Sequence, residues 1–353
     1  MSDRLKDNAA KEASFSAFLT RQLIKSVPPV TGNLDGQVAI VTGANVGLGL
    51  ACARQLLYLQ LSHLILAVRS LSKGEAAALD LRASFPHARV QVWVLEMESY
   101  ASIQAFVSRC RSELGRVDIA ILNAGLALKS FQTCTNPQTT PRETTLQVNF
   151  LSTAFLALLL LPSLDARKGK KDAVSVPGRL TLVGSDTAYW VDARGLQGQP
   201  LLQAANSSQG FDGFERYKMT KLFVLMFVAK LARDLVSPDK VIVNVACPGL
   251  CKGTAFVREP DSNWAKQAIM SSLIHLMGRT PEQGARVYLD AALLQGPQSH
   301  GSMISEGDIL PYPPIMYTDP SLIDQLWKEI KLEFEVAGIS SCLPEEIELH
   351  GVL

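Results

Sequence analysis

Short apolar runs alternate with segments of helical periodicity along most of this chain, from about residue 37 onward. The runs are continuously apolar instead of alternating, which is typical of strands buried on both faces of a parallel sheet. Strands are expected at residues 37–43, 63–68, 90–95, 117–123, 179–184 and 240–246. Helices are expected at residues 47–60, 72–84, 99–114, 142–164 and 214–235. This order predicts a doubly wound α/β domain with a parallel sheet.

The pattern predicts one domain over residues 36–353, preceded by an N-terminal arm over residues 1–35. Within the arm, Phe15, Phe18, Leu19 and Leu23 recur at helical spacing, which predicts a helix over residues 15–24. Pro28 and Pro29 end it. We expect the helix to pack on the protein's own body, with a membrane surface or a partner protein as the alternatives.

Three connections are longer than a compact fold requires, at residues 125–141, 186–213 and 250–278. Each follows a strand, and ligands of such sheets bind outside the carboxyl ends of the strands. We therefore expect these connections to form walls of a site, the last one as a helical lid. Disordered insertions are the alternative, although Trp190 and Trp264 favour ordering.

Composition and charge narrow the possible functions. The net charge of +1 and the 19% of charged residues give no electrostatic reason to expect nucleic acid as a partner. The six cysteines lack a repeated pair spacing, which indicates reduced thiols, and Cys247 and Cys251 have no second pair to complete a metal site.

The polar N-terminus lacks the apolar core of a secretory signal. The apolar stretch Phe155–Leu164 is shorter than the ~18 to 20 residues of a membrane span. We expect a cytoplasmic protein with no metal and no transmembrane segment.

A glycine-rich turn, TGANVGLG at residues 42–49, joins the first strand to the first helix of the sheet. At Gly43, Gly47 and Gly49 the missing side chains let a pyrophosphate approach the backbone N–H groups and the positive end of the helix. Asn45 and Leu48 lie in the same turn. Its position after the first strand of an α/β alternation is what a dinucleotide site requires.

The second strand ends in Val68 and Arg69, where a protein that binds NAD usually has an acidic residue for the ribose 2′-OH. An arginine can instead pair with the 2′-phosphate of NADP. Lys73 is near enough in sequence to assist, although a solvated lysine is the simpler interpretation. The preferred cofactor is therefore NADP(H).

Tyr217 and Lys221 are four residues apart in an expected helix, so the phenol and the ammonium can point into one site. Bringing a tyrosine from its usual pKa of ~10 to neutrality requires roughly 4 kcal/mol from nearby positive charge. Lys221 and a nicotinamide ring could supply that charge. Alone, such a pair is more commonly found on a protein surface, but here Ser185 follows the fifth strand and the glycine turn precedes both.

Together these motifs resemble the short-chain dehydrogenase/reductase family, with LNAG at 122–125, Asn149 in VNF, YKMTK at 217–221 and CPG at 247–249 in the same order. The resemblance covers about residues 36–290 and implies the Rossmann form of the fold. The arm and the segment LAVRSLSKGEAA are most similar to fungal, retinol-dehydrogenase-like members, several of which serve secondary-metabolite pathways.

The resemblance implies roles for the matching residues. Tyr217 would be the catalytic acid/base, Lys221 would lower its pKa and bind the nicotinamide ribose, Ser185 would orient the carbonyl, and Asn149 would hold a proton-relaying water. The remaining cofactor contacts would come from Glu96 beside the adenine, from Asn123, Ala124 and Gly125, and from Pro248, Gly249 and Thr254 near the nicotinamide.

Leu122, Gly184 and Glu96 depart from the family pattern in ways that look tolerated. A larger departure is the spacing of 32 positions between Ser185 and Tyr217, far more than in many members. We expect the inserted residues to loop out and shape the substrate pocket.

The leading hypothesis is an NADP(H)-dependent oxidoreductase that interconverts a carbonyl and an alcohol on a hydrophobic small molecule, in a setting such as secondary metabolism. A catalytically silent scaffold or sensor is one alternative, and a lyase, epimerase or cyclase that uses the same pocket is another. The family often dimerises through the helices expected at 142–164 and 214–235, so a homodimer is one open state and burial of those helices within the monomer is the other.

Overall fold

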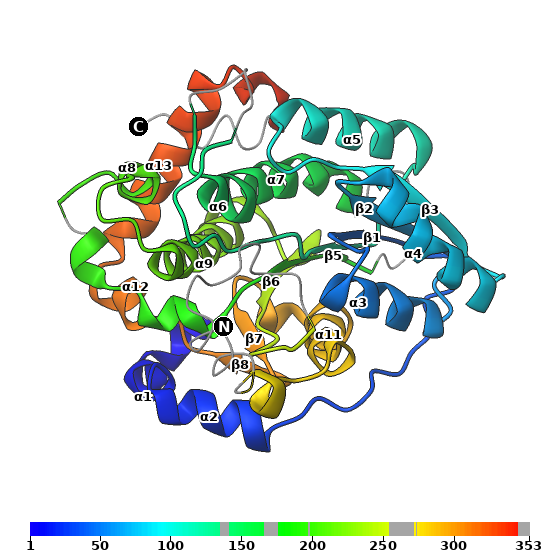
Figure 1. Cartoon of the computed structure of the whole chain (residues 1–353), viewed down its shortest axis with the longest axis horizontal. Helices are drawn as coiled ribbons and strands as arrows, with labels where there is room; N and C mark the ends of the chain where they lie inside the picture. Colours follow the sequence, from blue (N-terminus) through cyan, green and yellow to red (C-terminus); the bar gives the residue numbers. More distant parts are fainter. Residues whose placement is uncertain (135–140, 166–175, 197, 254–271, 273, 345–353) are drawn as a thin grey trace.

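The computed structural model describes residues 1–134, 141–165, 176–196, 198–253, 272 and 274–344. Figure 1 shows a central sheet with helices on both faces.

The sheet has eight strands in the order β3-β2-β1-β4-β5-β6-β7-β8. Strands β1 to β7 run parallel, and β8 is antiparallel to β7. The strands are β1 (Val38–Thr42), β2 (His63–Val68), β3 (Arg89–Val94), β4 (Ile119–Leu122), β5 (Gly178–Val183), β6 (Val241–Ala246), β7 (Met303–Ser305) and β8 (Asp308–Leu310). The reversal of strand order beside β1 confirms the doubly wound, Rossmann-like fold.

Two hydrophobic clusters, one on each face, hold the helices to this sheet. Ile40 of β1 belongs to one cluster, while its neighbours Ala39 and Val41 belong to the other, because successive side chains of a strand point to opposite faces. The first face carries α5 (Tyr100–Glu113), α7 (Ser152–Leu164) and α9 (Gly213–Lys230). The opposite face carries α3 (Gly47–Tyr58), α4 (Leu71–Ser84) and α11 (Pro281–Leu289).

The helix expected at residues 142–164 is a composite. It begins as α6 (Thr144–Leu146), widens into the π-helix η2 (Gln147–Leu151) and continues as α7. The whole segment Thr144–Leu164 is long and apolar enough to cross a membrane, yet its apolar window is entirely buried within the protein. It is the buried core helix that the sequence predicted, longer than the apolar stretch alone. The helix expected at 214–235 likewise ends in a π-helix, η5 (Leu231–Leu235).

The hairpin of β7 and β8 was not expected from the sequence. Each strand has three residues, too few to show a periodicity. A two-residue turn joins them, with both Glu306 (φ 48°) and Gly307 (φ 82°) in the left-handed region. A residue followed by glycine between apolar runs is a hairpin signal, and here it could have revealed the two strands.

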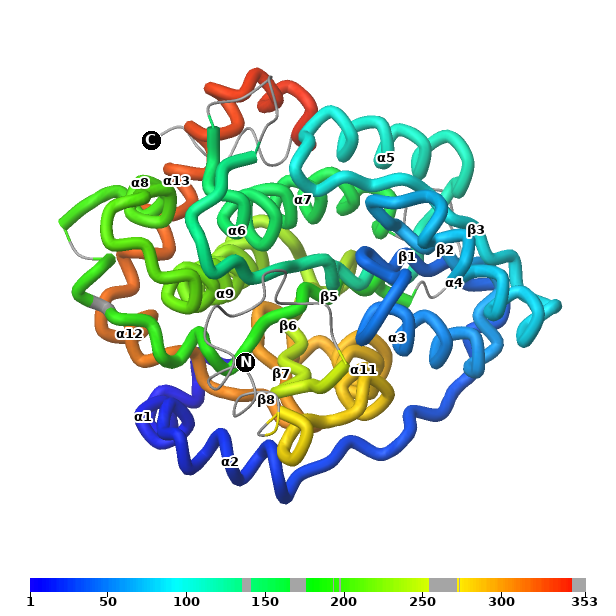
Figure 2. Tube along the Cα trace, viewed as in Figure 1, coloured from blue at the N-terminus to red at the C-terminus, as the bar shows by residue number. Residues whose placement is uncertain are grey.

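The N-terminal arm packs on the body, as its apolar spacing suggested. It comprises η1 (Ser2–Asn8), α1 (Ala9–Glu12) and α2 (Phe15–Ile24), and Ser14 caps α2 by accepting a hydrogen bond from the N–H of Ala17. In Figure 2 the arm crosses the lower edge of the molecule before the chain enters β1. Its first residues are tied to the β7–β8 hairpin, since Ser2 Oγ donates to the carbonyl of Leu310.

The C-terminal part folds back over the first face. After α11 come η6 (Asp290–Leu294), η7 (Pro297–Ser299) and the hairpin, then α12 (Pro314–Thr318), α13 (Ser321–Val336) and η8 (Ser340–Cys342). Helix α13 packs against α9 and against α8 (Leu201–Asn206).

Candidate active site

A cavity of about 970 Å³ lies at the carboxyl ends of the central strands. Its wall contains nearly all the residues that the sequence singled out: Gly43, Asn45, Gly47, Leu48, Arg69, Lys73, Glu96, Asn123, Ala124, Gly125, Ser185, Tyr217, Lys221, Pro248 and Gly249. Gly49 and Asn149 lie just behind the wall. Thr254, and with it residues 254–271 of the expected lid, lies outside the described residues.

The glycine turn forms a cradle at one end of the cavity. Gly43 (φ +64°) and Gly47 (φ +58°) hold left-handed conformations that favour glycine. At Gly49, a Cβ atom would come within 2.4 Å of the carbonyl oxygen of Gly43, so only glycine lets α3 start this close to β1. The N-cap residue Val46 offers no side-chain acceptor to the first N–H groups of α3. A phosphate would be the missing acceptor, and the cradle therefore fits the pyrophosphate of a dinucleotide.

Asn123 braces this cradle from β4. Its Nδ2 donates to the carbonyl of Thr42 at 2.9 Å, and its Oδ1 accepts from the hydroxyl of Tyr288 at 3.0 Å. The N–H of Ala124 donates to Thr42 Oγ1 at 2.9 Å. Tyr288, on α11, also lines the cavity and was missed because nothing in its local sequence marks it. It connects α11 to the exit of β4 through Asn123.

Arg69 and Lys73 lie on the cavity wall where β2 gives way to α4, as the sequence suggested. The Arg69 side chain is 55% exposed, and its guanidinium lies 3.9 Å from a carboxylate oxygen of Glu96 and 3.8 Å from one of Glu98. Ser70, the N-cap of α4, accepts from the N–H of Lys73. Arg69, Lys73 and the N-terminus of α4 thus lie at this end of the cavity, with the carboxylates of Glu96 and Glu98 near Arg69.

Ser185, Tyr217 and Lys221 converge on the opposite wall. Ser185 follows β5, while Tyr217 and Lys221 lie one turn apart on α9, whose N-terminus is capped by the carboxylate of Asp212. Lys221 Nζ lies 5.6 Å from the centre of the Tyr217 ring and donates to the carbonyl of Val183 at 2.7 Å. The Ser185 and Tyr217 side chains are hydrogen-bonded. The hydroxyl of Ser185, after β5, and the phenol of Tyr217, on α9, therefore lie side by side near Lys221.

Burial raises the pKa of Tyr217 well above its ordinary value, and the hydrogen bond with Ser185 only partly opposes this. The expectation that Lys221 and a nicotinamide ring together lower the pKa of Tyr217 stays a prediction. A phenol that keeps its proton is suited to act as an acid.

Burial lowers the pKa of Lys221 from 10.5 to about 8, and Cys247 partly opposes this shift. The side chain is 5% exposed. Lys221 therefore carries its charge at neutral pH, but in an environment that disfavours it.

Asn149 lies in the π-helix η2, where the wider turn displaces its side chain from the regular helical position. Its Oδ1 accepts from the N–H of Leu126 and its Nδ2 donates to the carbonyl of the same residue, both at 2.8 Å. The amide thus holds the chain where it leaves β4. Its expected role in holding a water stays a prediction.

Comparison with known proteins identifies the family to which this chain belongs. The family model for short chain dehydrogenases matches residues 37–179. The short chain dehydrogenase opdN of Penicillium oxalicum is 88% identical over 311 residues, which is 88% of this chain and 100% of that protein. The short chain dehydrogenase virL of Hypocrea virens is 45% identical over 347 residues, which is 96% of this chain and 97% of that protein. The chain belongs to the short-chain dehydrogenase family. It is thus a member of a family of oxidoreductases.

Solved structures of this family share the fold. The NADPH-dependent 3-quinuclidinone reductase of Rhodotorula rubra superposes with a TM-score of 0.56 at 21% identity, over 81% of this chain and 98% of that one. The L-sorbose reductase of Gluconobacter frateurii, complexed with NADPH and L-sorbose, gives 0.56 at 23% identity, over 77% and 95%.

The insertion between Ser185 and Tyr217 of this short-chain dehydrogenase contributes to the cavity wall, as expected. Among its described residues, Thr187 and Trp190 of the 3-10 turn η3 (Asp186–Trp190) line the cavity, and so does Phe214 at the start of α9. The rest runs through η4 (Ala193–Leu196) into α8, whose first N–H groups, of Leu201 and Leu202, donate to Glu329 of α13. The insertion therefore has two described roles: its first residues line the pocket, and α8 packs against the C-terminal helix α13.

Asp186, Leu250 and Cys251 line the cavity and lie within two of the connections that were expected to form its walls. The sequence did not single out Phe18, from the N-terminal arm, or Phe214, at the start of α9. The helical spacing of Phe18 predicted that its side chain is buried, but it could not indicate which residues the side chain packs against.

Proposed function

We propose that this protein is an NADP(H)-dependent oxidoreductase that interconverts a carbonyl and an alcohol on a hydrophobic small molecule. The observation that carries the proposal is the convergence of Ser185, Tyr217 and Lys221 on one wall of a cavity whose other end is the glycine cradle. A cofactor lying between the two would reach both.

The chain's own groups would divide the work as follows. Tyr217, which is protonated at neutral pH, gives its proton to the carbonyl oxygen as the general acid. The Ser185 hydroxyl, already beside the phenol, hydrogen-bonds the same oxygen and stabilises the charge that develops there. Lys221 holds the nicotinamide ribose. A bound NADPH supplies the hydride.

Arg69 and Lys73 support NADP(H) over NAD(H), because both cations lie on the cavity wall where β2 ends. The Arg69 side chain is more than half exposed, so its guanidinium is accessible to a 2′-phosphate. Two structural neighbours, an NADPH-dependent reductase and a reductase complexed with NADPH, agree with this choice. A cytoplasmic setting in fungal secondary metabolism completes the proposal, in line with the fungal relatives.

Turnover of NADPH with a panel of ketones and aldehydes, with product identification, tests this function. We expect Tyr217→Phe to lower kcat by about 10²- to 10⁴-fold while the Kd for NADPH changes little, since only proton transfer is removed. Tyr58→Phe, at an exposed position of α3, is the matched control and should retain full activity.

The alternatives give different outcomes in that assay. A silent scaffold or sensor would bind NADPH without oxidising it, and a lyase, epimerase or cyclase would convert substrate without net NADPH oxidation. Full activity of Tyr217→Phe would exclude Tyr217 as the acid.

The cofactor choice has its own test. We expect Arg69→Asp to weaken NADPH binding and to improve NADH binding, because an aspartate repels the 2′-phosphate and accepts from a 2′-OH. Binding titrations with both cofactors measure the ratio of the two Kd values. An unchanged NADPH affinity would contradict the assignment.

A further inference from the structure

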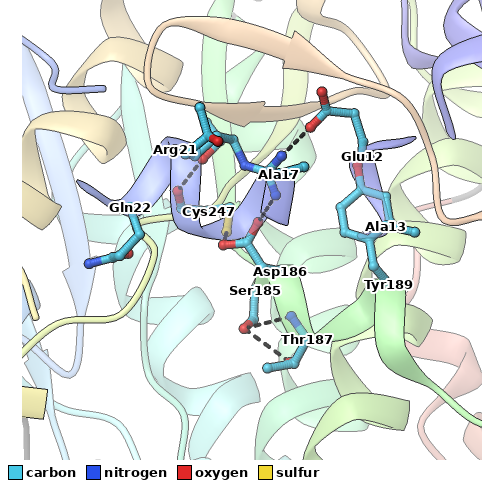
Figure 3. A network of polar contacts seen from close by, with 12 residues as sticks. Glu12, Ala13, Ala17, Arg21, Gln22, Ser185, Asp186, Thr187, Tyr189 and Cys247 are labelled. Carbon is cyan, nitrogen blue, oxygen red and sulfur yellow. Dashed lines mark hydrogen bonds and ion pairs between the residues drawn. The ribbon is translucent and has the colours of Figure 1, made fainter. Parts of the chain in front are cut away.

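Helix α2 of the N-terminal arm is fixed onto the cavity by side chains that the catalytic residues do not use. Arg21, which is buried, makes an ion pair with Asp186 at 2.7 Å, and Asp186 directly follows Ser185. Figure 3 shows the Arg21 guanidinium between Glu12 and Asp186, with the thiol of Cys247 on the far side of the same carboxylate. That thiol donates to Asp186 Oδ2 at 3.2 Å. The arm thus supplies the cation for a buried carboxylate beside the catalytic serine.

Gln22, the next residue on α2, holds the loop after β6. Its amide donates to the carbonyls of Leu250 and Met277 and accepts from the N–H of Leu250. A Cβ atom on Gly249 (φ +72°) would come within 2.5 Å of Gln22 Oε1, so glycine is required for this approach. The arm therefore fits the expected nicotinamide end of the cavity closely.

These anchors place Phe18 in the cavity wall, one helical turn before Gln22. Its ring lies edge-to-face with Trp190, 5.4 Å between centres, and Trp190 Nε1 donates to the carbonyl of Ala13 at 3.0 Å. Trp190 lies in η3, five residues after Ser185. An aromatic pair from two distant segments thus faces the space in front of Ser185 and Tyr217.

The carboxylate of Asp186, which lines this part of the cavity, is already neutralised. Its two oxygens are bonded to Arg21 and Cys247, and the other charged side chain beside Ser185 and Tyr217 is Lys221. Three aromatic side chains of the described wall, Phe18, Trp190 and Phe214, line the cavity together with Ser185 and Thr187. Aromatic rings in a cavity wall favour flat apolar ligand groups, which stack on the rings or meet them edge-on.

We infer that helix α2 belongs to the substrate site, and that Phe18 together with Trp190 selects an uncharged substrate with a flat aromatic ring. The inference rests on the proposed carbonyl reduction and extends it to a substrate class and to a specificity-determining residue outside the catalytic domain's own loops.

The test compares 2-acetonaphthone, a flat neutral aromatic ketone, with 2-butanone in the full-length protein. In each reaction the ketone gains a hydride from NADPH and a proton, and NADP⁺ is released. We expect Phe18→Ala to lower kcat/KM for 2-acetonaphthone by roughly 5- to 20-fold, mainly through KM, while the value for 2-butanone changes less than about twofold. Leu23→Ala, at an exposed position of the same helix, is the matched control and should alter neither value.

Phe18→Leu, which preserves the apolar volume, guards against a folding defect in the alanine variant and should show an intermediate loss. The Kd of 2-acetonaphthone in the presence of NADP⁺, measured by calorimetry, reports on the site without turnover. The inference is overturned if Phe18→Ala leaves the substrate ratio unchanged, if both substrates lose equally, or if the wild-type protein does not bind 2-acetonaphthone. Binding that depends on Phe18 without any ketone turnover would support the inference and refute the proposed reductase.

Discussion

The buried Lys221 lowers the stability of the folded protein, and it is also one of the proposed catalytic residues. Its ammonium is buried, and its hydrogen bond to the carbonyl of Val183 does not restore the lost hydration. The folded state consequently holds the Lys221 proton only up to about pH 8, whereas the unfolded chain holds it up to about 10.5. Below pH 8 this difference disfavours folding.

We expect Lys221→Met to abolish reduction and to raise the free energy of unfolding at about pH 7 by roughly 1 to 3 kcal/mol. Between about pH 8 and 10.5 the unfolded wild type binds more protons than the folded wild type, so wild-type stability rises with pH and the advantage of the variant shrinks. Urea unfolding of both proteins at about pH 7 and pH 10 measures this.

Lys218→Met is the matched control on the same helix, since the Lys218 ammonium has Glu215 as its counter-ion. It should give no comparable gain. A Lys221→Met protein that is less stable than the wild type at neutral pH would show that burial is not what shifts this lysine.

At the scale of elements, α2 depends on one buried ion pair. Burial disfavours the charge of Arg21, but Asp186 and Glu12 outweigh it and raise the pKa of Arg21 above its ordinary value. The side chains of Arg21 and Asp186 are 5% and 6% exposed, so neither is compensated by water if its partner is removed.

We expect Arg21→Met to destabilise the protein by about 3 to 5 kcal/mol, because it leaves the Asp186 carboxylate buried without a cation. Adding Asp186→Asn should recover much of that loss, since the uncompensated charge is gone. Urea unfolding of the two single variants and the double variant gives the coupling energy.

The surface pair of Lys25 with Asp308 provides the reference, its side chains being 45% and 53% exposed. Lys25→Met should change the free energy of unfolding by no more than about 1 kcal/mol. Equal effects of Arg21→Met and Lys25→Met would mean that α2 is not held by its ion pair.

At the scale of the whole molecule, the helices that could have formed a dimer interface are covered by the chain itself. Helix α7 is buried along most of its length between the sheet and α5, and α9 lies beneath α13. Figure 1 shows α13 running along the side of the molecule that carries α8 and α9. Of the two states that the sequence left open, burial within the monomer is the one this packing favours.

We therefore expect a monomer in solution, with a mass near the 38.3 kDa of the chain. Size-exclusion chromatography with light scattering, over a range of protein concentrations, measures it. A mass near twice that value at low concentration would contradict the expectation and would call for an interface away from α7 and α9.

Much of the fold followed from local patterns. The strands β1 to β6 and the helices between them were expected within a few residues of their bounds, because a strand buried on both faces is apolar throughout. The short hairpin of β7 and β8 was not expected, because a strand of three residues is too short to show a hydrophobic periodicity. The glycine cradle and the Tyr217–Lys221 pair could be predicted from the sequence, because the residues of each motif lie within a few positions of one another.

The sequence by itself determined the six strands β1 to β6, the glycine cradle and most of the residues that line the cavity, since each rests on periodicity or on motifs within one turn or one helix. Only the tertiary structure decided that Phe18 lines the cavity and Arg21 pairs with Asp186, that α8 in the insertion before Tyr217 bonds to α13, and that burial shifts the pKa values of Tyr217 and Lys221. Those facts depend on contacts between segments far apart along the chain and on the water that such contacts exclude, and neither has a local signature in the sequence.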